Sequence, residues 1–218
     1  MDGNISEQQQ VEEIRKWLHE NGTSIIVGVV IGLAAVFGWR AWEGHRHATA
    51  QQASLAYSRM VNDITAGKMD AAIAEGEAII AGYNNTSYAD FSALLLASAK
   101  MQQSDATASR AHLQWVISNT RQPELKQLAM LRSARVLLAE KKIDEALKQL
   151  DAMAPDAYVA LRADLTGDLY RAKGDITQAR NAYQQALAAL DKSKPELQDP
   201  IRMKLDAIGG VKVQESAQ

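Results

Sequence analysis

The chain begins with a short polar segment, continues with one uninterrupted apolar stretch, and then shows apolar residues at helical spacing to near its end. The apolar stretch runs from Asn21 to Trp39 without a charged residue, and Glu20 and Arg40 bound it. A helix rises about 1.5 Å per residue, so this stretch would span about 28 Å, close to the hydrocarbon core of a bilayer. The pattern therefore predicts a transmembrane helix over residues 21–42.

Two other interpretations of the stretch are a cleaved signal peptide and a helix buried in a soluble core. A signal peptide starts with a short basic segment and ends in a small-residue cleavage site close behind its apolar core. Here a segment with several acidic residues comes first, and charged residues separate the stretch from the A-x-A sequence at Ala48–Ala50. A helix packed on a soluble core keeps a polar face, which this stretch lacks. We therefore expect an uncleaved anchor, with Trp17, Trp39 and Trp42 in the headgroup regions.

The charges that flank the stretch do not orient it in the membrane. Arg15 and Lys16 precede it, whereas Arg40, Arg46 and Arg59 follow it. The positive-inside rule compares such flanks, but long domains often cross a membrane regardless of differences this small. The charge pattern alone leaves the orientation open.

Small residues mark one face of the predicted span. Gly28 and Gly32 form a G-x-x-x-G pair, and Ala35 and Gly38 roughly continue that face. Small residues let another helix approach the backbone closely in lipid. Glycine is also common in membrane helices without such a partner. Gly28 and Gly32 are therefore the candidates for membrane-helix packing, and an ordinary lipid-facing span is the alternative.

Residues 1–20 are predicted to form a short amphipathic tail. Val11, Ile14 and Leu18 fall at helical spacing, with charged residues between them. Such a segment either lies on the membrane surface or forms the first turns that lead into the span. The sequence leaves both possibilities open.

The region after the span contains a repeat, whose last copy includes KGDITQARNAYQQAL at residues 173–187. Small and aromatic residues follow one another in the order Gly167, Tyr170, Gly174, Ala179, Tyr183 and Ala186. This order resembles the tetratricopeptide repeat, a helix-turn-helix unit of about 34 residues. Gly167 and Ala179 are small where the two helices would cross. Gly174 would end the first helix, and Asp175 would cap the second.

Weaker copies of the repeat can be traced toward the N-terminus. The residues equivalent to Ala179 are Ala72, Ser109 and Ala146, and the successive equivalents lie 37, 37 and 33 residues apart. A single helical hairpin cannot bury its apolar face, whereas stacked hairpins can. We therefore predict an all-α fold, with a single N-terminal transmembrane helix followed by a tetratricopeptide-like α-solenoid.

The predicted organisation has three parts after the span. Residues 43–66 form a helical linker into the solenoid, and residues 67–210 form the tetratricopeptide-like domain itself. Within that domain, residues 193–208 form a terminal capping helix that turns Ile201, Leu205 and Ile208 toward the last repeat. Residues 211–218 are expected to be a frayed tail.

Composition supports the helical prediction and excludes several classes of function. The 218 residues include no cysteine, which excludes disulfides, thiolate metal sites and a cysteine nucleophile. Proline and phenylalanine are scarce, which argues against a β-sandwich. The net charge is −2 and no dense block of lysine or arginine is present, so nucleic acid is not an expected partner.

No motif for catalysis, a cofactor or a metal is present. His45 and His47 are two residues apart and would not share one face of a helix. His112 has Ser109 nearby, but no acidic partner or oxyanion motif accompanies the two. The sequence contains neither a phosphate-binding loop nor a dinucleotide fingerprint. We therefore predict a protein that is not an enzyme.

The inner face of the predicted solenoid is the candidate surface for binding another protein, because the concave face of such repeats is usually the working surface. The first helices of successive repeats would present there Phe91, Leu94, Met101, Leu131, Arg135, Asp168 and Arg171. Leu161 holds an equivalent position. The alternative is that Leu94, Leu131 and Leu161 simply pack inside the domain.

Three segments carry a resemblance to a known family. They are GWRAWEGHRHATAQQASLAYSRMV, LRSARVLLAEKKIDEALKQLDAM and ADLTGDLYRAKGDITQARNAYQQAL. With the acidic tail and the single apolar span, they resemble the YfgM family of Gram-negative bacteria across nearly the whole chain. The resemblance implies a cytoplasmic N-terminus, one helix across the inner membrane and a tetratricopeptide-like domain in the periplasm. No catalytic residue is implied.

The resemblance also implies a function and partners. The family is an ancillary component of the SecYEG translocon and associates with PpiD, a membrane-anchored periplasmic chaperone. The implied role is to help pass emerging secretory or outer-membrane polypeptides to periplasmic chaperones, beside contact with membrane lipid. Two alternatives remain: a regulator of envelope stress whose tail binds a cytoplasmic response regulator, and a scaffold for envelope assembly.

Overall fold

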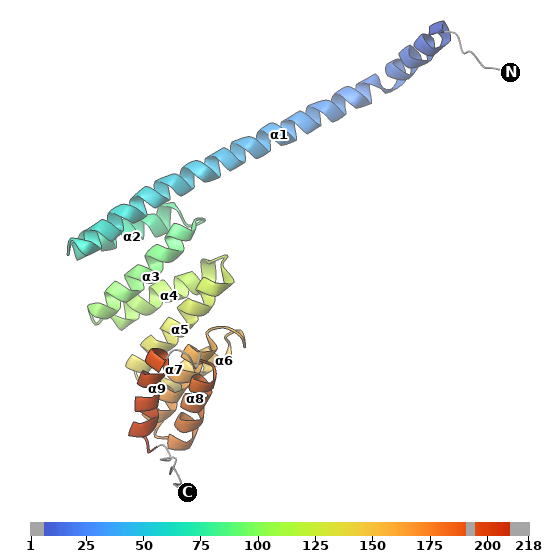
Figure 1. Cartoon of the computed structure of the whole chain (residues 1–218). Coiled ribbons are helices and arrows are strands. Elements are labelled where there is room, and N and C mark those ends of the chain that lie inside the picture. The colour runs from blue at the N-terminus through green and yellow to red at the C-terminus, as the bar shows by residue number, and fades with distance from the viewer. Residues whose placement is uncertain (1–6, 191–194, 210–218) are drawn as a thin grey trace, which may run out of the picture. The chain divides into compact units, whose positions relative to one another are not determined.

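A computed structural model describes residues 7–190 and 195–209. Every regular element among them is an α-helix (Figure 1), which confirms the predicted fold class. The predicted frayed tail, residues 211–218, lies outside the described residues, as do the first six residues of the N-terminal tail. The helices are α1 (Glu7–Thr65), α2 (Met69–Gly82), α3 (Ser87–Gln102), α4 (Ala106–Asn119), α5 (Pro123–Ala139), α6 (Ile143–Asp151), α7 (Val159–Lys173), α8 (Ile176–Ala188) and α9 (Pro195–Ala207).

The chain divides into two compact units, and the first comprises residues 1–52. Its described part is the first portion of α1, which joins the predicted amphipathic segment and the span in one continuous helix. The described large apolar side chains between Val11 and Trp42 are exposed over half of their surface or more. Among the described residues, α1 alone is long and apolar enough to cross a membrane. Hydrocarbon would cover these side chains, which agrees with the predicted anchor.

Two tryptophans and an arginine gather at the end of the apolar stretch. The ring centroids of Trp39 and Trp42 lie 5.2 Å apart, and the guanidinium carbon of Arg46 lies 4.8 Å from the Trp42 centroid. Aromatic rings and cations of this kind favour the headgroup region of a bilayer. The position of this cluster agrees with a span that ends near residue 42.

The second compact unit begins at Ala53, inside the segment predicted as a helical linker, residues 43–66. Ala53, Ala56 and Met60 are buried, and Ala56 and Met60 share a hydrophobic cluster with residues of α2 and α3. The last part of the predicted linker is therefore the first helix of the first hairpin. The sequence hid this boundary because α1 continues through it without a turn or a capping residue.

Four helical hairpins make up most of the second unit. They pair the end of α1 with α2 through a shared hydrophobic cluster, α3 with α4, α5 with α6, and α7 with α8, and each hairpin packs on the next one along the chain (Figure 1). The four equivalent small residues named from the repeat, Ala72, Ser109, Ala146 and Ala179, are all buried at the helix crossings. The predicted repeat spacing is therefore confirmed by burial in every hairpin.

Beside each helix crossing, one small and one large residue face each other, one from each helix of the hairpin. Gly167 faces Tyr183 in the last hairpin, where an added Cβ would lie 2.5 Å from the ring. In the two middle hairpins the equivalent pairs are Ala97 with Leu113 and Ala134 with Leu150. In the first hairpin the order is reversed, because the large residue, Met60, lies on the first helix and the small one, Gly76, on the second. A Cβ added to Gly76 would lie 2.8 Å from the Met60 methyl carbon. The combined volume, rather than either residue type, is what the crossing requires.

The predicted end of α7 and start of α8 are confirmed. Gly174 has φ +86°, a left-handed conformation that costs a glycine little. Asp175 then accepts a hydrogen bond from the backbone N–H of Gln178 at 3.0 Å, as the cap of α8. Asp105 caps α4 through the N–H of Ala108 in the same way.

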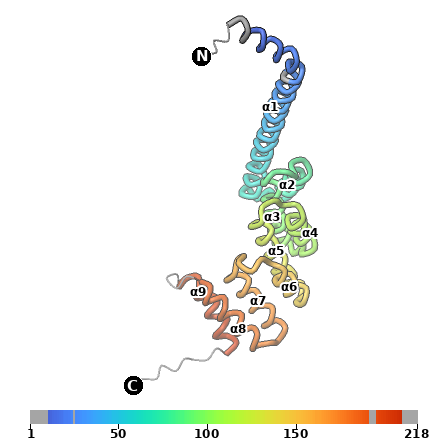
Figure 2. Tube along the Cα trace, turned by 90° about the vertical axis from the view of Figure 1, so that its right-hand side faces the viewer, coloured from blue at the N-terminus to red at the C-terminus, as the bar shows by residue number. Residues whose placement is uncertain are grey.

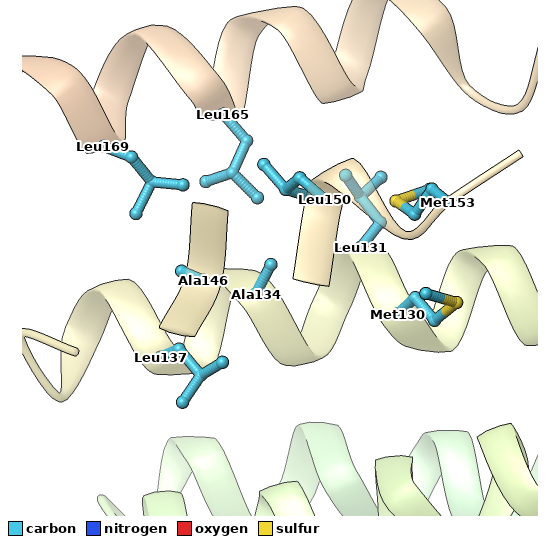
Figure 3. Packing of buried hydrophobic residues seen from close by; sticks show 9 residues of the cluster. All are labelled: Met130, Leu131, Ala134, Leu137, Ala146, Leu150, Met153, Leu165 and Leu169. Atoms are coloured by element: carbon cyan, nitrogen blue, oxygen red, sulfur yellow. The ribbon is translucent and has the colours of Figure 1, made fainter. Parts of the chain in front are cut away.

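A core continues between the third and fourth hairpins. Leu165 and Leu169 point from α7 toward α5 and α6, where Leu131 and Leu150 meet them (Figure 3). The chain then ends on α9, which packs beside α8 in both views (Figure 1, Figure 2). Ile201 of α9 is buried against Tyr183 and its neighbours, so the predicted capping helix is present.

Candidate protein-binding groove

A groove with a volume of about 520 Å³ lies between α3 and α5, the first helices of the second and third hairpins. The two helices neighbour each other in both views (Figure 1, Figure 2). The floor is apolar, and an exposed serine and two exposed arginines stand at its rim. The lining residues are Leu94, Leu95, Ala97, Ser98, Met101, Ser109, Leu113, Arg132, Arg135, Val136 and Ala139.

The structure brings three of the seven predicted surface residues together in this groove. Leu94 is buried to 6% exposure and forms part of the floor, Met101 is partly buried, and Arg135 is exposed. These residues come from two different helices and line the same groove, and their role in binding stays a prediction. The groove is wide enough to accept side chains of another polypeptide.

Leu131 does not contribute to that surface. Its side chain is only 2% exposed and packs in the core between α5, α6 and α7 (Figure 3). The alternative, in which this leucine packs inside, therefore holds for Leu131. It does not hold for Leu161, which is 47% exposed. The difference arises because Leu165 and Leu169 of the next hairpin cover Leu131.

Phe91 lies in a small aromatic cluster at the first two hairpins. Its ring centroid is 6.2 Å from that of Tyr57, which in turn lies 5.7 Å from the Tyr88 ring. Burial raises the pKa of Tyr57 above its ordinary value. Phe91 is itself only partly buried. The cluster therefore offers a partly exposed apolar surface, although it is not part of the groove.

Asp168 and Arg171 are held in a network of charges between α7 and α9. The Lys204 ammonium donates to Asp168 Oδ2 at 2.8 Å and to both carboxylate oxygens of Asp164 at 2.8 and 2.9 Å. The Tyr183 hydroxyl donates to Asp168 Oδ1 at 2.8 Å, and the guanidinium of Arg171 lies 3.9 Å from the same oxygen. Burial, together with the bond to Asp168, raises the pKa of Tyr183 strongly. Asp168 is therefore occupied by partners within the chain.

This network was missed because it joins residues that are far apart in sequence. The amphipathic pattern of α9 indicated which face packs on the last repeat, but Lys204 lies beside that face rather than in it. The Asp168 side chain is 18% exposed and contacts α9, and its predicted role in binding stays a prediction. Arg171 remains about half exposed.

Ser109 and His112 form no nucleophile and base pair. The Ser109 hydroxyl is buried and has no hydrogen-bond partner in the described part of the chain. His112 lines a different hollow with Glu77, Trp115 and Asn119, and burial lowers its pKa. Among residues 7–190 and 195–209, no group of His, Asp and Glu side chains could hold a metal ion.

In the membrane-spanning part of α1, Gly28 and Gly32 have open space around them. A Cβ built at either position meets nothing within 4 Å. The two glycines lie one turn apart on the helix, so both are accessible from the same side. Their role in packing against another membrane helix stays a prediction.

Comparison with known proteins extends over nearly the whole chain. The model of a family described as tetratricopeptide repeat-like domain matches residues 15–210. A protein of Escherichia coli K12 named ancillary SecYEG translocon subunit is 33% identical over 92% of this chain and 96% of its own length. Proteins of the same name from Haemophilus influenzae and Neisseria gonorrhoeae are 31% and 23% identical, over 84% and 95% of this chain and 89% and 100% of their own lengths.

No solved structure gives a significant match to the chain. The family match nevertheless includes both the span and all the helical hairpins. The chain therefore belongs to the tetratricopeptide repeat-like family that includes the ancillary SecYEG translocon subunits, the YfgM family that its sequence resembles.

Proposed function

We propose that this protein is an ancillary subunit of the SecYEG translocon and acts there as a scaffold that binds other proteins without catalysis. The observation that carries the proposal is the kinship with proteins of that name, at 33% identity over 92% of the chain. The span and the groove supply the two surfaces that such a subunit needs. One would hold the protein at the channel, and the other would receive a polypeptide.

The proposed location is the inner membrane, with the N-terminal tail in the cytoplasm and the helical hairpins in the periplasm. The exposed apolar part of α1 supports a single membrane span. Its flanking charges do not decide the orientation, which rests on the family resemblance. A fusion of alkaline phosphatase after residue 209 tests it, because that enzyme is active only in the periplasm. Activity of a green fluorescent protein fusion at the same position, without phosphatase activity, would reverse the orientation.

The groove between α3 and α5 is the proposed contact for PpiD or for an emerging secretory or outer-membrane polypeptide. Its apolar floor would bury apolar side chains, and its open rim leaves room for an extended chain. Ser98 is exposed at that rim, so it can be changed without disturbing the core. Substitution of Ser98 by glutamate should fill and charge the groove, and thereby weaken the contact.

Affinity purification of the full-length protein from membranes in mild detergent tests the proposal directly. We expect SecY, SecE or SecG in the eluate, together with PpiD. A matched variant keeps the hairpins but replaces residues 21–42 with an unrelated span of equal length. If translocon subunits stay bound to that variant, the hairpins carry the association; if they are lost, the span does.

A second pair of variants separates packing of the span from its mere presence. Gly28→Leu and Gly32→Leu together would prevent a close helix contact while the apolar length is kept. Loss of translocon subunits from this variant would assign the contact to the glycine face. Recovery of cell-wall enzymes instead of translocon subunits from the wild-type protein would overturn the proposal in favour of envelope assembly. Deletion of residues 1–20 tests whether the tail binds a response regulator independently.

A further inference from the structure

We propose that the groove between α3 and α5 selects polypeptide segments that carry carboxylate side chains next to apolar residues. This inference rests on the proposed function, because it names the chemistry of the segment that the groove would receive. Arg132 and Arg135 carry the argument. Both lie on α5, are exposed, and line the groove above its apolar floor.

These two arginines differ from every other arginine of the hairpin domain. Within the described residues from 53 onward, neither Arg132 nor Arg135 makes a hydrogen bond or an ion pair. The others all bind an acidic, amide or backbone carbonyl oxygen; they are Arg59, Arg110, Arg121, Arg162, Arg171, Arg180 and Arg202. The domain therefore satisfies its arginines internally except at the groove.

The surroundings of the two guanidinium groups contain no competing acid. The groove lining includes apolar residues, two serines and the two arginines, but no aspartate or glutamate. A guanidinium group presents several N–H donors in a planar fork that matches a carboxylate. Placed beside apolar surface, it binds a carboxylate more strongly than it would in open water, because less solvent screens the pair. The two guanidinium groups are therefore available to bind an anion from a partner.

The last hairpin shows how the same face of the domain behaves when charges are matched. There Asp164 and Asp168 hold positions equivalent to residues of α3 and α5 at the groove, and Lys204 of α9 forms an ion pair with both. The last hairpin carries acids that have a cation within the chain, whereas the groove carries cations that have no acid within its lining. A segment that follows the apolar floor would supply the missing carboxylates.

Fluorescence anisotropy with the full-length protein in lipid nanodiscs tests the inference. The probe is a short labelled peptide that contains leucines and aspartates, with an amidated C-terminus. A second peptide has asparagine in place of each aspartate, and a third has asparagine together with a free C-terminal carboxylate. We expect the aspartate peptide to bind about fivefold more tightly than the amidated asparagine peptide, as two partly exposed ion pairs would allow.

The double variant Arg132→Gln and Arg135→Gln should bind both amidated peptides equally and keep the affinity of the asparagine peptide. Lys126→Gln with Lys148→Gln is the matched control, because it removes the same charge from exposed positions outside the groove. That control should retain the preference. If the preference follows net charge and disappears in the control as well, the inference is wrong.

Two further outcomes are decisive. Equal binding of the two amidated peptides to the wild-type protein overturns the inference, although copurification with the translocon would still support the proposed function. Preference for the free C-terminus over the side-chain carboxylates would assign the arginines to chain ends and also overturn it. Failure of all peptides to bind, with translocon copurification intact, would remove the groove as a binding site while the scaffold role remains.

Discussion

Gly167 is the position at which this fold should tolerate a side chain least. Substitution by alanine would place a Cβ 2.5 Å from two carbon atoms of the Tyr183 ring. That ring is fully buried, and its hydroxyl is held by Asp168, so it cannot turn aside without losing a hydrogen bond. The helices α7 and α8 must therefore separate, or the ring must leave its place.

Two opposing effects set the magnitude. Overpacking of a close contact costs about 1–3 kcal/mol. Alanine is favoured over glycine inside a helix by about 1 kcal/mol. Because the contact of 2.5 Å is with a fully buried ring, the packing cost lies in the upper half of its range, about 2–3 kcal/mol, and we expect Gly167→Ala to destabilise the last hairpin by about 1–2 kcal/mol.

A second substitution makes this reasoning quantitative. In the middle hairpins, alanine at this position faces leucine, as Ala97 faces Leu113. Tyr183→Leu would lose the ring and the bond to Asp168, and would be destabilising alone. In that background, however, Gly167→Ala should be neutral or stabilising, because the pair then matches the middle hairpins. The double-mutant cycle should give a favourable coupling of about 2 kcal/mol.

Hydrogen exchange measured by mass spectrometry is the suitable assay, since a repeat domain can lose its terminal hairpin without unfolding elsewhere. Peptides from α7 and α8 should exchange faster in Gly167→Ala, while peptides from α3 and α4 should not change. Gly76→Ala is the comparison and should be milder, because an added Cβ there would lie 2.8 Å from the flexible end of Met60 and 3.0 and 3.1 Å from two Leu96 carbons, and not against a rigid ring. If Gly167→Ala left exchange in α7 and α8 unchanged, the argument from volume would be refuted.

Three further predictions concern charge and capping. Lys204→Met should lower the free energy that holds α9 on the domain by about 2 kcal/mol, because the two α7 carboxylates lose their partner. Faster hydrogen exchange in α9 would show this loss, whereas unchanged exchange would mean that solvent replaces the lysine. Burial raises the pKa of Asp90 above 3.8, while the hydrogen bond from Thr120 opposes the shift. The protonated carboxyl therefore stabilises the fold below pH 3.8, and this stabilisation is lost as the pH rises through the raised pKa. Asp90→Asn should therefore raise the melting temperature at pH 7, with a gain that shrinks toward pH 4, and a gain independent of pH would contradict the assignment. Asp175→Ala should cost about 1 kcal/mol through loss of the α8 cap, measured by thermal denaturation, whereas Asp175→Asn should restore most of it.

The repeat was readable in the sequence because its signals are local. Gly174 and Asp175 lie next to each other, and both act within one turn of the chain. The small residues at the crossings recur at nearly constant spacing, since each hairpin solves the same packing problem. Reversal of the large and small residues at Met60 and Gly76 explains why the first copy was weak.

The candidate surface was only partly readable. The phase of the repeat identified Met101 and Arg135, because both positions face the same side of their helices. It also selected Leu131, which another hairpin covers, and Asp168, which forms an ion pair with Lys204 of α9. Arg132 was missed because the repeat phase selected Leu131 and Arg135 on α5, whereas Arg132, about one turn before Arg135, also lines the groove.

The sequence by itself determined that the chain has one apolar span and a series of helical hairpins. The reason is that helix length, apolar periodicity and capping depend on residues close together along the chain. The tertiary structure alone decided where the packed domain begins, which inner positions remain open, and which charges are already paired. Those properties depend on contacts between hairpins and with α9, which join residues tens of positions apart. Burial and pairing across such distances leave no periodic signal in the sequence.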